Sequence, residues 1–256
     1  MSLNHGPMSE GRLVSFDPEW LLRKIVLGPN LRRMFRPIEE GVAHVPTEGP
    51  AILAANHLSF SDWIFIPLAL NRRVTFAAKS DYFTGSGVKG FLQRKFFAGT
   101  GQVPVDRSGG RAGLAALRAG LQVLDDGGLF GIFPEGTRSH DGRLYRGRTG
   151  VARLALDSGA PVIPVGLIGT DQIAPPGKLL TRIMSPTVRF GAPLDLGHLI
   201  GTAPERQVLR TMTDEIMSAI RDLSGQTYVD HYAPTAKQKA RREQAGRRRN
   251  RGRSDR

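Results

Sequence analysis

The chain has 256 residues, of which 40% are hydrophobic and 23% charged, a balance that is typical of a globular domain and excludes wholesale disorder. Because it contains no cysteine, disulfides, thiolate zinc sites and cysteine nucleophiles are excluded. No uncharged stretch approaches the ~18 apolar residues of a membrane-spanning helix, and no secretion signal is recognisable, so we expect a protein on the cytoplasmic side.

The first segment with a clear pattern runs from Trp20 to Arg36 and reads WLLRKIVLGPNLRRMFR. It combines five basic residues with several large apolar side chains and contains no acidic residue. Gly28-Pro29 predicts a break into two short helices, because proline disrupts a helix interior. The composition fits a helix at an anionic membrane interface, and it fits equally a helix packed on the core with its basic face in water.

From residue 49 onward, short apolar segments alternate with segments of helical periodicity. We expect strands at 51–54, 74–78, 102–105, 129–133, 162–167 and 187–190. Leucines at helical spacing predict a helix that ends at Gly127-Gly128, and Thr202 to Glu205 predicts a capping box that opens another. This alternation predicts a mixed α/β fold with a mostly apolar central sheet flanked by helices, preceded by the short N-terminal interfacial segment.

Among the histidines, His57 has the setting that best suits catalysis. It directly follows the apolar strand at 51–54, and Asp62 lies five residues further on. A five-residue step in a regular helix turns through roughly 500°, so the two side chains meet only if His57 lies in a turn and Asp62 in the first helical turn. Such a pair would be a general base with its orienting carboxylate. The alternative is a structural histidine in a capped turn.

The segment 133–139 reads FPEGTRS and follows another expected strand. Gly136 would let the backbone approach a ligand closely, and Arg138 offers a planar fork for phosphate. Thr137 adds a hydroxyl, and Glu135 would accept a hydrogen bond from a ligand or hold Arg138. The alternative is a polar turn with an internal Glu–Arg ion pair.

Two further cations follow expected strands, namely Lys79 after 74–78 and Arg107 after 102–105. Ligands of open α/β sheets bind outside one edge of the strands, so these cations would face the same region as His57 and Arg138. Taken singly, each of them is equally an ordinary surface charge.

The residues from Ala236 to Arg256 include ten Lys or Arg and two acidic residues, with no apolar side chain larger than alanine. Such a segment cannot bury enough surface to fold alone, which predicts a disordered tail. Either it is simply solvated, or it is an electrostatic anchor for a polyanion such as nucleic acid or an anionic membrane.

Taken in order, these segments resemble the glycerolipid acyltransferase family, the 1-acylglycerol-3-phosphate acyltransferases. The matching blocks are Asn56-His57 with Asp62, the stretch from Gly101 to Arg107, the letter-for-letter match at 133–139, and the apolar strand with proline at 162–166. The resemblance covers about 41 to 192. The arginine-rich tail is not part of the family pattern.

The resemblance implies transfer of a fatty acyl group from acyl-CoA or acyl-carrier protein to the sn-2 hydroxyl of 1-acylglycerol-3-phosphate, which gives phosphatidic acid. It implies His57 as general base and Asp62 as its partner. The substrate-binding residues implied are Lys79, Arg107, Glu135, Gly136, Thr137 and Arg138. The alternatives are another acceptor, such as a different lysolipid or glycerol 3-phosphate, and, in another class, a basic nucleic-acid-binding protein. A metal hydrolase lacks a convincing third ligand.

The organisation expected from these features is a membrane-associating segment at 1–40, an acyltransferase domain at 41–225 and a basic tail at 226–256. We expect no metal and no cofactor beyond the acyl-CoA or acyl-carrier protein co-substrate. The expected partners are a lysophospholipid, the acyl thioester and an anionic membrane surface. The expected location is the cytoplasmic face of the cell membrane, with peripheral or monotopic attachment.

Overall fold

The structure is a computed structural model that describes residues 18–80, 87, 102–105, 112–174, 182–201 and 205–234. For residues 18–26, 79, 103–105 and 112 it describes the backbone alone. Arg107, residues 202–204 of the expected capping box and the basic tail from Ala236 therefore lie outside the described residues.

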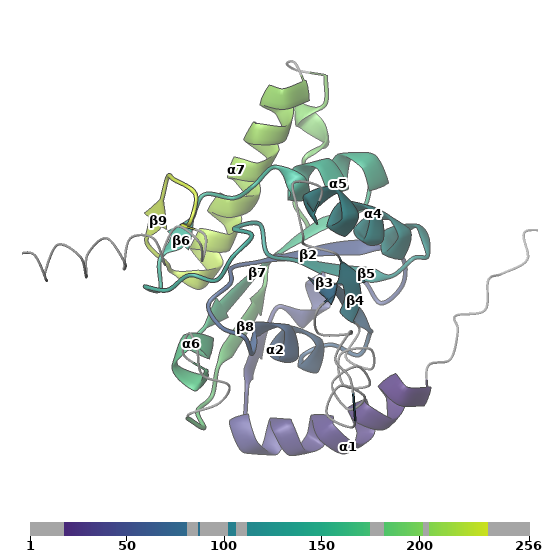
Figure 1. The fold of residues 1–256 in the computed structure, drawn as a ribbon, viewed down its shortest axis with the longest axis vertical. Coiled ribbons are helices and arrows are strands. Elements are labelled where there is room, and N and C mark those ends of the chain that lie inside the picture. The colour runs from purple at the N-terminus through teal and green to yellow at the C-terminus, as the bar shows by residue number, and fades with distance from the viewer. Residues whose placement is uncertain are drawn as a thin grey trace, which may run out of the picture.

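Within the described residues, a seven-stranded mixed sheet forms the centre of the molecule, in the order β1-β8-β7-β2-β5-β3-β4 (Figure 1). Its strands are β1 (Ile38–Glu40), β2 (Ala51–Ala55), β3 (Val74–Lys79), β4 (Gln102–Val105), β5 (Leu129–Ile132), β7 (Val162–Ile168) and β8 (Thr187–Phe190). The strands from β7 through β2, β5 and β3 to β4 pair in parallel, whereas β8 pairs antiparallel with β7. The expected strands are confirmed, each within one residue at either end. The parallel strands end at one edge, where the expected site residues follow them.

Helices cover both faces of this sheet. They are α1 (Pro18–Phe35), α2 (Asp62–Leu68), α4 (Ala112–Asp125), α5 (Gly150–Ser158), α6 (Thr170–Ile173) and α7 (Glu205–Ser224), with short 3-10 turns η1 (Val42–His44) and η3 (Gly197–Leu199). Because side chains alternate along a strand, β2 sends Leu53 into the cluster that contains Phe65 of α2, and Ile52 into the cluster that contains Leu154 of α5 and Ile216 of α7. Burial on both faces explains the unbroken apolar sequence of β2. The expected fold class is confirmed.

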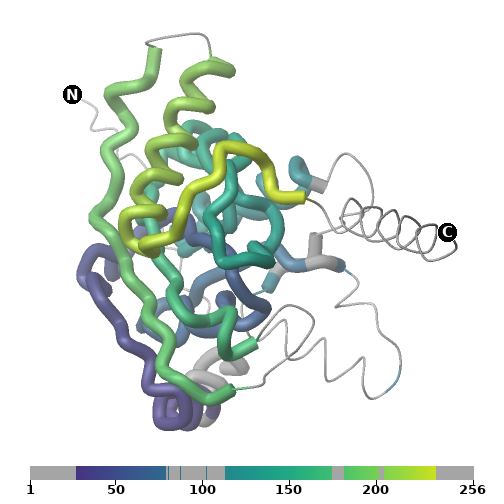
Figure 2. Tube along the Cα trace, turned by 90° about the vertical axis from the view of Figure 1, so that its left-hand side faces the viewer, coloured from purple at the N-terminus to yellow at the C-terminus, as the bar shows by residue number. Residues whose placement is uncertain are grey.

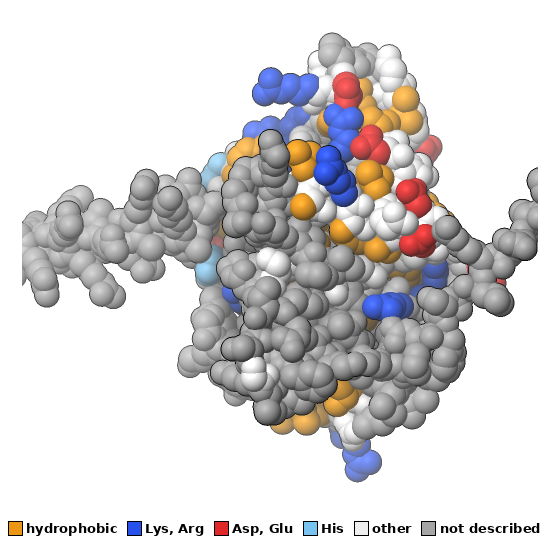
Figure 3. Space-filling model, turned by 45° about the vertical axis from the view of Figure 1, so that its right-hand side comes forward, with side chains coloured by type: hydrophobic (Ala, Val, Ile, Leu, Met, Phe, Trp, Pro, Cys, Tyr) orange, Lys and Arg blue, Asp and Glu red, His pale blue; other side chains and the backbone are white. Residues whose placement is uncertain are grey.

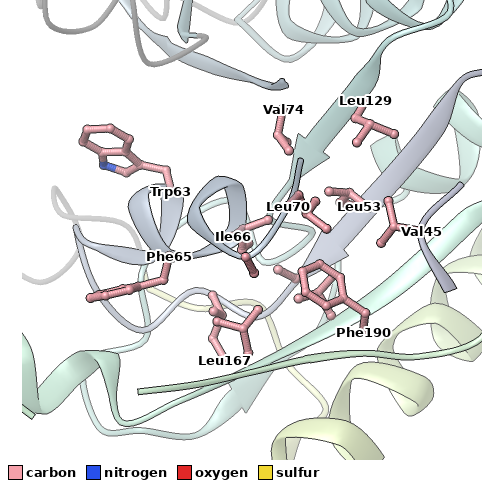
Figure 4. Packing of buried hydrophobic residues seen from close by; sticks show 14 of the residues in the cluster. Val45, Leu53, Trp63, Phe65, Ile66, Leu70, Val74, Leu129, Leu167 and Phe190 are labelled. Carbon is pink, nitrogen blue, oxygen red and sulfur yellow. The ribbon is translucent and has the colours of Figure 1, made fainter. Parts of the chain in front are cut away.

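Helix α2 is held firmly on its face of the sheet, which matters because it begins at Asp62. Figure 4 shows Ile66 of α2 directed toward Leu167 of β7, and both side chains belong to the buried cluster that contains Leu53 of β2. Ile66, Leu53 and Leu167 are completely buried. Complete burial of an aliphatic side chain stabilises the fold by about 1.5–3 kcal/mol, so this packing fixes the start of the helix relative to β2.

The N-terminal segment forms one helix instead of the two that were predicted, because α1 continues through Pro29. Proline removes one backbone hydrogen bond and crowds the preceding turn, at a cost of about 3 kcal/mol in a helix interior. The C-terminal part of α1 is anchored to the core by Phe35, which is buried and meets Phe65 edge to face. Gly28 also lies next to Leu68 of α2. This tertiary packing outweighs the local preference for a break.

A small two-stranded sheet sits beside the main one, formed by β6 (Leu144–Tyr145) and β9 (Tyr228–Val229) in parallel. In Figure 2 the yellow segment near the C-terminus crosses the teal part of the chain that carries β6. At the other end, β1 pairs with β8 at the edge of the main sheet. The folded unit therefore extends beyond the expected 41–225 at both ends.

Charges of both signs lie side by side on one face of the described part of the molecule. On the face shown in Figure 3, acidic side chains lie among basic and hydrophobic ones, so the net positive charge does not gather there into one described patch. Among the described residues, no helix combines the length and the apolar character that a membrane span requires.

Candidate active site

The centre of the candidate site is a histidine–carboxylate pair. His57 lies in the turn after β2, and Asp62 is the first residue of α2. The distance from His57 Nδ1 to Asp62 Oδ2 is 2.8 Å. The side chain of Asp62 is completely buried, whereas that of His57 keeps 18% of its surface exposed. The predicted geometry, with one residue in the turn and the other in the first helical turn, is confirmed.

The carboxylate of Asp62 is fixed by the backbone of the same turn. The N–H groups of Leu58 and Ser59 donate to Asp62 Oδ2 over 2.7 and 2.8 Å. Asp62 also lies at the N-terminus of α2, where the helix dipole favours a negative charge. The carboxylate is therefore held in one orientation, and it leaves Nε2 of His57 as the ring nitrogen directed away from it.

The backbone of His57 is clamped from the loop that follows β5. Its N–H donates to Glu135 Oε1 over 3.0 Å, and its carbonyl accepts from the Ser139 N–H over 2.7 Å. Glu135 and Ser139 are both buried. The FPEGTRS segment therefore supports the loop that carries the histidine, a function that its sequence does not indicate.

Glu135 is a supporting residue, which corrects the prediction that it binds substrate. It is completely buried, and Glu135 Oε2 accepts from the Tyr145 N–H over 2.9 Å. With both oxygens engaged by backbone donors and no exposed surface, the side chain cannot reach a ligand. Burial raises the pKa of Glu135 from 4.5 to about 7, against the opposing effect of the two backbone hydrogen bonds.

The imidazole is packed against an aromatic ring that the sequence analysis did not assign to the site. Phe133 stacks on His57 with ring centroids 4.0 Å apart and planes 12° apart, and Phe76 of β3 stacks on Phe133 at 5.5 Å. Together with Asp62, this stack restricts the rotation of the imidazole. The sequence signal was only that Phe133 ends an apolar strand, which does not distinguish a core ring from a site ring.

Asn56 ties the end of β2 to its neighbour. Its amide donates to the carbonyl of Leu167 over 2.9 Å and to Gln226 Oε1 over 2.7 Å, and its oxygen accepts from the Leu167 N–H over 2.7 Å. Asn56 is completely buried. The residue before the histidine thus locks the turn onto β7.

A neighbouring arginine accounts for the glycine at position 136, and the close approach of a ligand to this backbone stays a prediction. Its φ is +72°, and a Cβ at this position would lie 2.9 Å from Arg148 Nε. Its N–H donates to the carbonyl of Phe133 over 3.0 Å, so this amide is already engaged. Within the described residues, no hydrogen bond or ion pair holds the half-buried Arg138, and Thr137 beside it is also half-buried.

The two remaining cations are placed only in part. Lys79 ends β3, and its backbone pairs with Val105 at the end of β4, which precedes Arg107 by two residues in the sequence. The side chain of Lys79 and the whole of Arg107 lie outside the described residues. In the part of the chain that is described, no group of three His, Asp or Glu side chains is placed to hold a metal ion.

Comparison with known proteins adds to this geometry. The family model described as Acyltransferase matches residues 36–168, just over half of the chain and the part that contains β2, the histidine–carboxylate pair and the FPEGTRS loop. The chain belongs to the Acyltransferase family. The matched region also contains Asn56 and Glu135, which both contribute hydrogen bonds around the turn that carries His57.

Relatives of known name agree with this membership. The chain is 34% identical to the chloroplastic 1-acyl-sn-glycerol-3-phosphate acyltransferase of Arabidopsis thaliana over 140 residues, which are 54% of this chain and 38% of that protein. It is 28% identical to the 1-acyl-sn-glycerol-3-phosphate acyltransferase of Bacillus subtilis over 185 residues, which are 70% of this chain and 84% of that protein. The chain therefore spans about two fifths of the length of the plant relative.

A solved structure shares the fold. The crystal structure of the 1-acyl-sn-glycerophosphate acyltransferase from Thermotoga maritima superposes with a TM-score of 0.57 at 23% sequence identity, covering 80% of this chain and 86% of that one. The arrangement of the sheet and its helices is thus that of a known acyltransferase structure.

Proposed function

We propose that this acyltransferase moves a fatty acyl group from an acyl thioester, acyl-CoA or acyl-carrier protein, to the sn-2 hydroxyl of 1-acylglycerol-3-phosphate to give phosphatidic acid. The observation that carries the proposal is the 2.8 Å contact between His57 and Asp62, supported by the FPEGTRS loop, in a member of the Acyltransferase family. The names of the relatives supply the substrate class.

His57 is the general base in this proposal. With Nδ1–H donating to Asp62, the lone pair of Nε2 accepts the proton of the acceptor hydroxyl. The hydroxyl oxygen attacks the thioester carbonyl and forms a tetrahedral intermediate. The carbon–sulfur bond then breaks, and the proton on Nε2 passes to the leaving thiolate. A buried Asp62 favours the transient imidazolium, and no acyl-enzyme is required.

The acceptor phosphate requires cations near the histidine, and Arg138, Lys79 and Arg107 are proposed for it. Lys79 is the last residue of β3, Arg138 lies in the loop after β5, and Arg107 comes two residues after β4 in the sequence. These strands are parallel to β2 or to its neighbours, so they end at the edge where His57 follows β2. Arg138 has no carboxylate partner among the described residues, which leaves its planar fork free for a phosphate. Thr137 adds a hydroxyl beside it.

The substrates are lipids, and we place the protein at the cytoplasmic face of the cell membrane through α1, as a peripheral or monotopic attachment. Leu27 and Met34 lie two helical turns apart on α1 and are 43% and 50% exposed. Arg33 lies beside Met34, in a combination that suits an anionic lipid surface. Replacing Leu27 and Met34 by glutamate should abolish flotation with anionic vesicles. Unchanged flotation would remove α1 as the anchor.

The reaction is tested by a matrix of donors and acceptors assayed by thiol release. The donors are acyl-CoA and acyl-carrier protein, and the acceptors are 1-acylglycerol-3-phosphate, other lysolipids and glycerol 3-phosphate. The matched control is the 2-deoxy analogue of 1-acylglycerol-3-phosphate, which keeps the phosphate and the acyl chain but lacks the nucleophile. We expect turnover with 1-acylglycerol-3-phosphate and none with the analogue. Preference for another acceptor, or thiol release without any acceptor, would contradict the proposal.

A further inference from the structure

Arg148 lies directly against the FPEGTRS loop, although it is ten residues beyond Arg138 in the sequence. Its Nε would be 2.9 Å from a Cβ on Gly136, so the side chain occupies the space that the glycine leaves open. The positive φ of Gly136 is a second reason why a residue with a side chain is unsuitable there. The glycine thus brings a second guanidinium beside the turn that carries Arg138.

The charge of Arg148 is not neutralised within the described part of the chain, in contrast to its neighbours. Arg143 pairs with Asp141 at 2.6 Å, and Arg146 lies 3.6 Å from Asp230. For Arg148, the contact in evidence is with an aromatic ring: its guanidinium carbon lies 5.2 Å from the centroid of Tyr232. An exposed guanidinium without a carboxylate keeps its full capacity to bind an anion.

The position of Arg148 is fixed before any ligand arrives. Its backbone N–H donates to the carbonyl of Pro134 over 2.8 Å, which anchors its Cα to the loop. The ring of Tyr232, from the segment after β9, supports the guanidinium from one side. A side chain held in this way loses little conformational entropy on binding, which favours recognition.

We propose that Arg148 joins Arg138 in binding a phosphate group of one of the substrates, an inference that rests on the proposed function. The planar guanidinium forks of two arginines suit the oxygens of a phosphate monoester or diphosphate. Such a group occurs both in the glycerol-3-phosphate acceptor and in a coenzyme A or phosphopantetheine donor. Among the described residues no carboxylate pairs with Arg148, and kinetic constants measured separately for the two substrates distinguish the two sources.

The experiment compares Arg148→Met with Arg146→Met. Arg146→Met is the matched control because it removes the same charge. The guanidinium carbon of Arg146 also lies near the ring of Tyr232, 5.8 Å from its centroid, but Arg146 is paired with Asp230. KM and kcat are measured for 1-acylglycerol-3-phosphate and, separately, for acyl-CoA. For Arg148→Met we expect one KM to rise roughly 10- to 100-fold, which corresponds to the loss of a hydrogen bond to a charged group. The kcat should stay nearly unchanged, because this hydrogen bond is equally strong in the bound substrate and in the transition state. Arg146→Met should change neither KM more than about twofold.

Which of the two KM values rises identifies the substrate whose phosphate Arg148 binds. A raised KM for the acceptor assigns Arg148 to the acceptor phosphate, and a raised KM for acyl-CoA assigns it to the donor. Two unchanged KM values in an active enzyme would overturn the inference and leave the proposed function intact. If the wild-type protein shows no acyl transfer, calorimetric titration with glycerol 3-phosphate and with coenzyme A replaces turnover. Weaker binding of either compound to Arg148→Met than to Arg146→Met supports the site, and equal binding overturns it.

Discussion

Replacing Glu135 by glutamine probes the buried support beneath the histidine loop. The carboxyl is completely buried, and burial raises its pKa from 4.5 to about 7. Between these two values the folded protein keeps a proton on Glu135 that the unfolded chain has released. The free energy of unfolding therefore falls as the pH rises through this window. Below pH 4.5 this group does not change the stability, and above pH 7 its destabilising contribution is constant.

The size of this effect follows from the shift. A difference of one pKa unit corresponds to 1.36 kcal/mol, so the shift of Glu135 gives a penalty of about 3 kcal/mol at alkaline pH. Glutamine resembles the protonated acid in shape and charge and does not titrate. The free energy of unfolding of Glu135→Gln, relative to that of the wild-type protein, should therefore rise by about 3 kcal/mol as the pH increases from 4.5 to 8.

Urea unfolding followed by circular dichroism at several pH values measures this difference. Glu48→Gln, at an exposed position, controls for the loss of one carboxylate. A difference between wild type and Glu135→Gln that stays constant across the pH range would refute the conclusion that a buried, protonatable carboxyl supports His57.

The other supports of the site give separate predictions. Asp62→Asn removes the acceptor that orients His57, and kcat in the thiol-release assay should fall roughly 100-fold or more while KM changes little; a normal kcat would exclude the orienting role. Asn56→Ala leaves buried backbone groups unpaired and should lower the free energy of unfolding by about 3 kcal/mol, whereas a loss under 1 kcal/mol would show that the turn does not depend on it. Gly166→Ala places a Cβ 2.8 Å from the backbone of Leu223 on α7, and urea unfolding should show a loss of about 1–3 kcal/mol; an unchanged midpoint would mean that the helix moves without cost.

The main sheet was predictable because its strands are buried on both faces and read as unbroken apolar runs. The sequence predicts β4 and β8 with the bounds that the structure has. The edge strand β1 was missed because its three residues, Ile38–Glu40, are partly exposed and include two acids, so they show no strand pattern. The pair β6 and β9 was missed because two-residue strands carry no periodicity and their pairing joins segments far apart in the chain.

Contacts in the site between residues close in sequence could be predicted, whereas contacts between residues far apart in the sequence could not. His57 and Asp62 are five residues apart, and the turn between them limits their geometry. The contact of Glu135 with the His57 N–H joins residues 78 positions apart, and glutamate is ordinarily a surface residue, so its burial could not be inferred. Arg148 was missed for the same reason, because only the folded chain brings it against Gly136.

The most direct test of the account is the rate of acyl transfer by His57→Ala, measured as thiol release with saturating acyl-CoA and 1-acylglycerol-3-phosphate. His198→Ala is the control, because this histidine is exposed and lies on η3, away from the sheet edge. Removal of a general base predicts a fall of roughly 10²- to 10⁴-fold in kcat for His57→Ala with an unchanged fold, and wild-type turnover for His198→Ala. A folded His57→Ala protein with near-normal turnover would contradict the account.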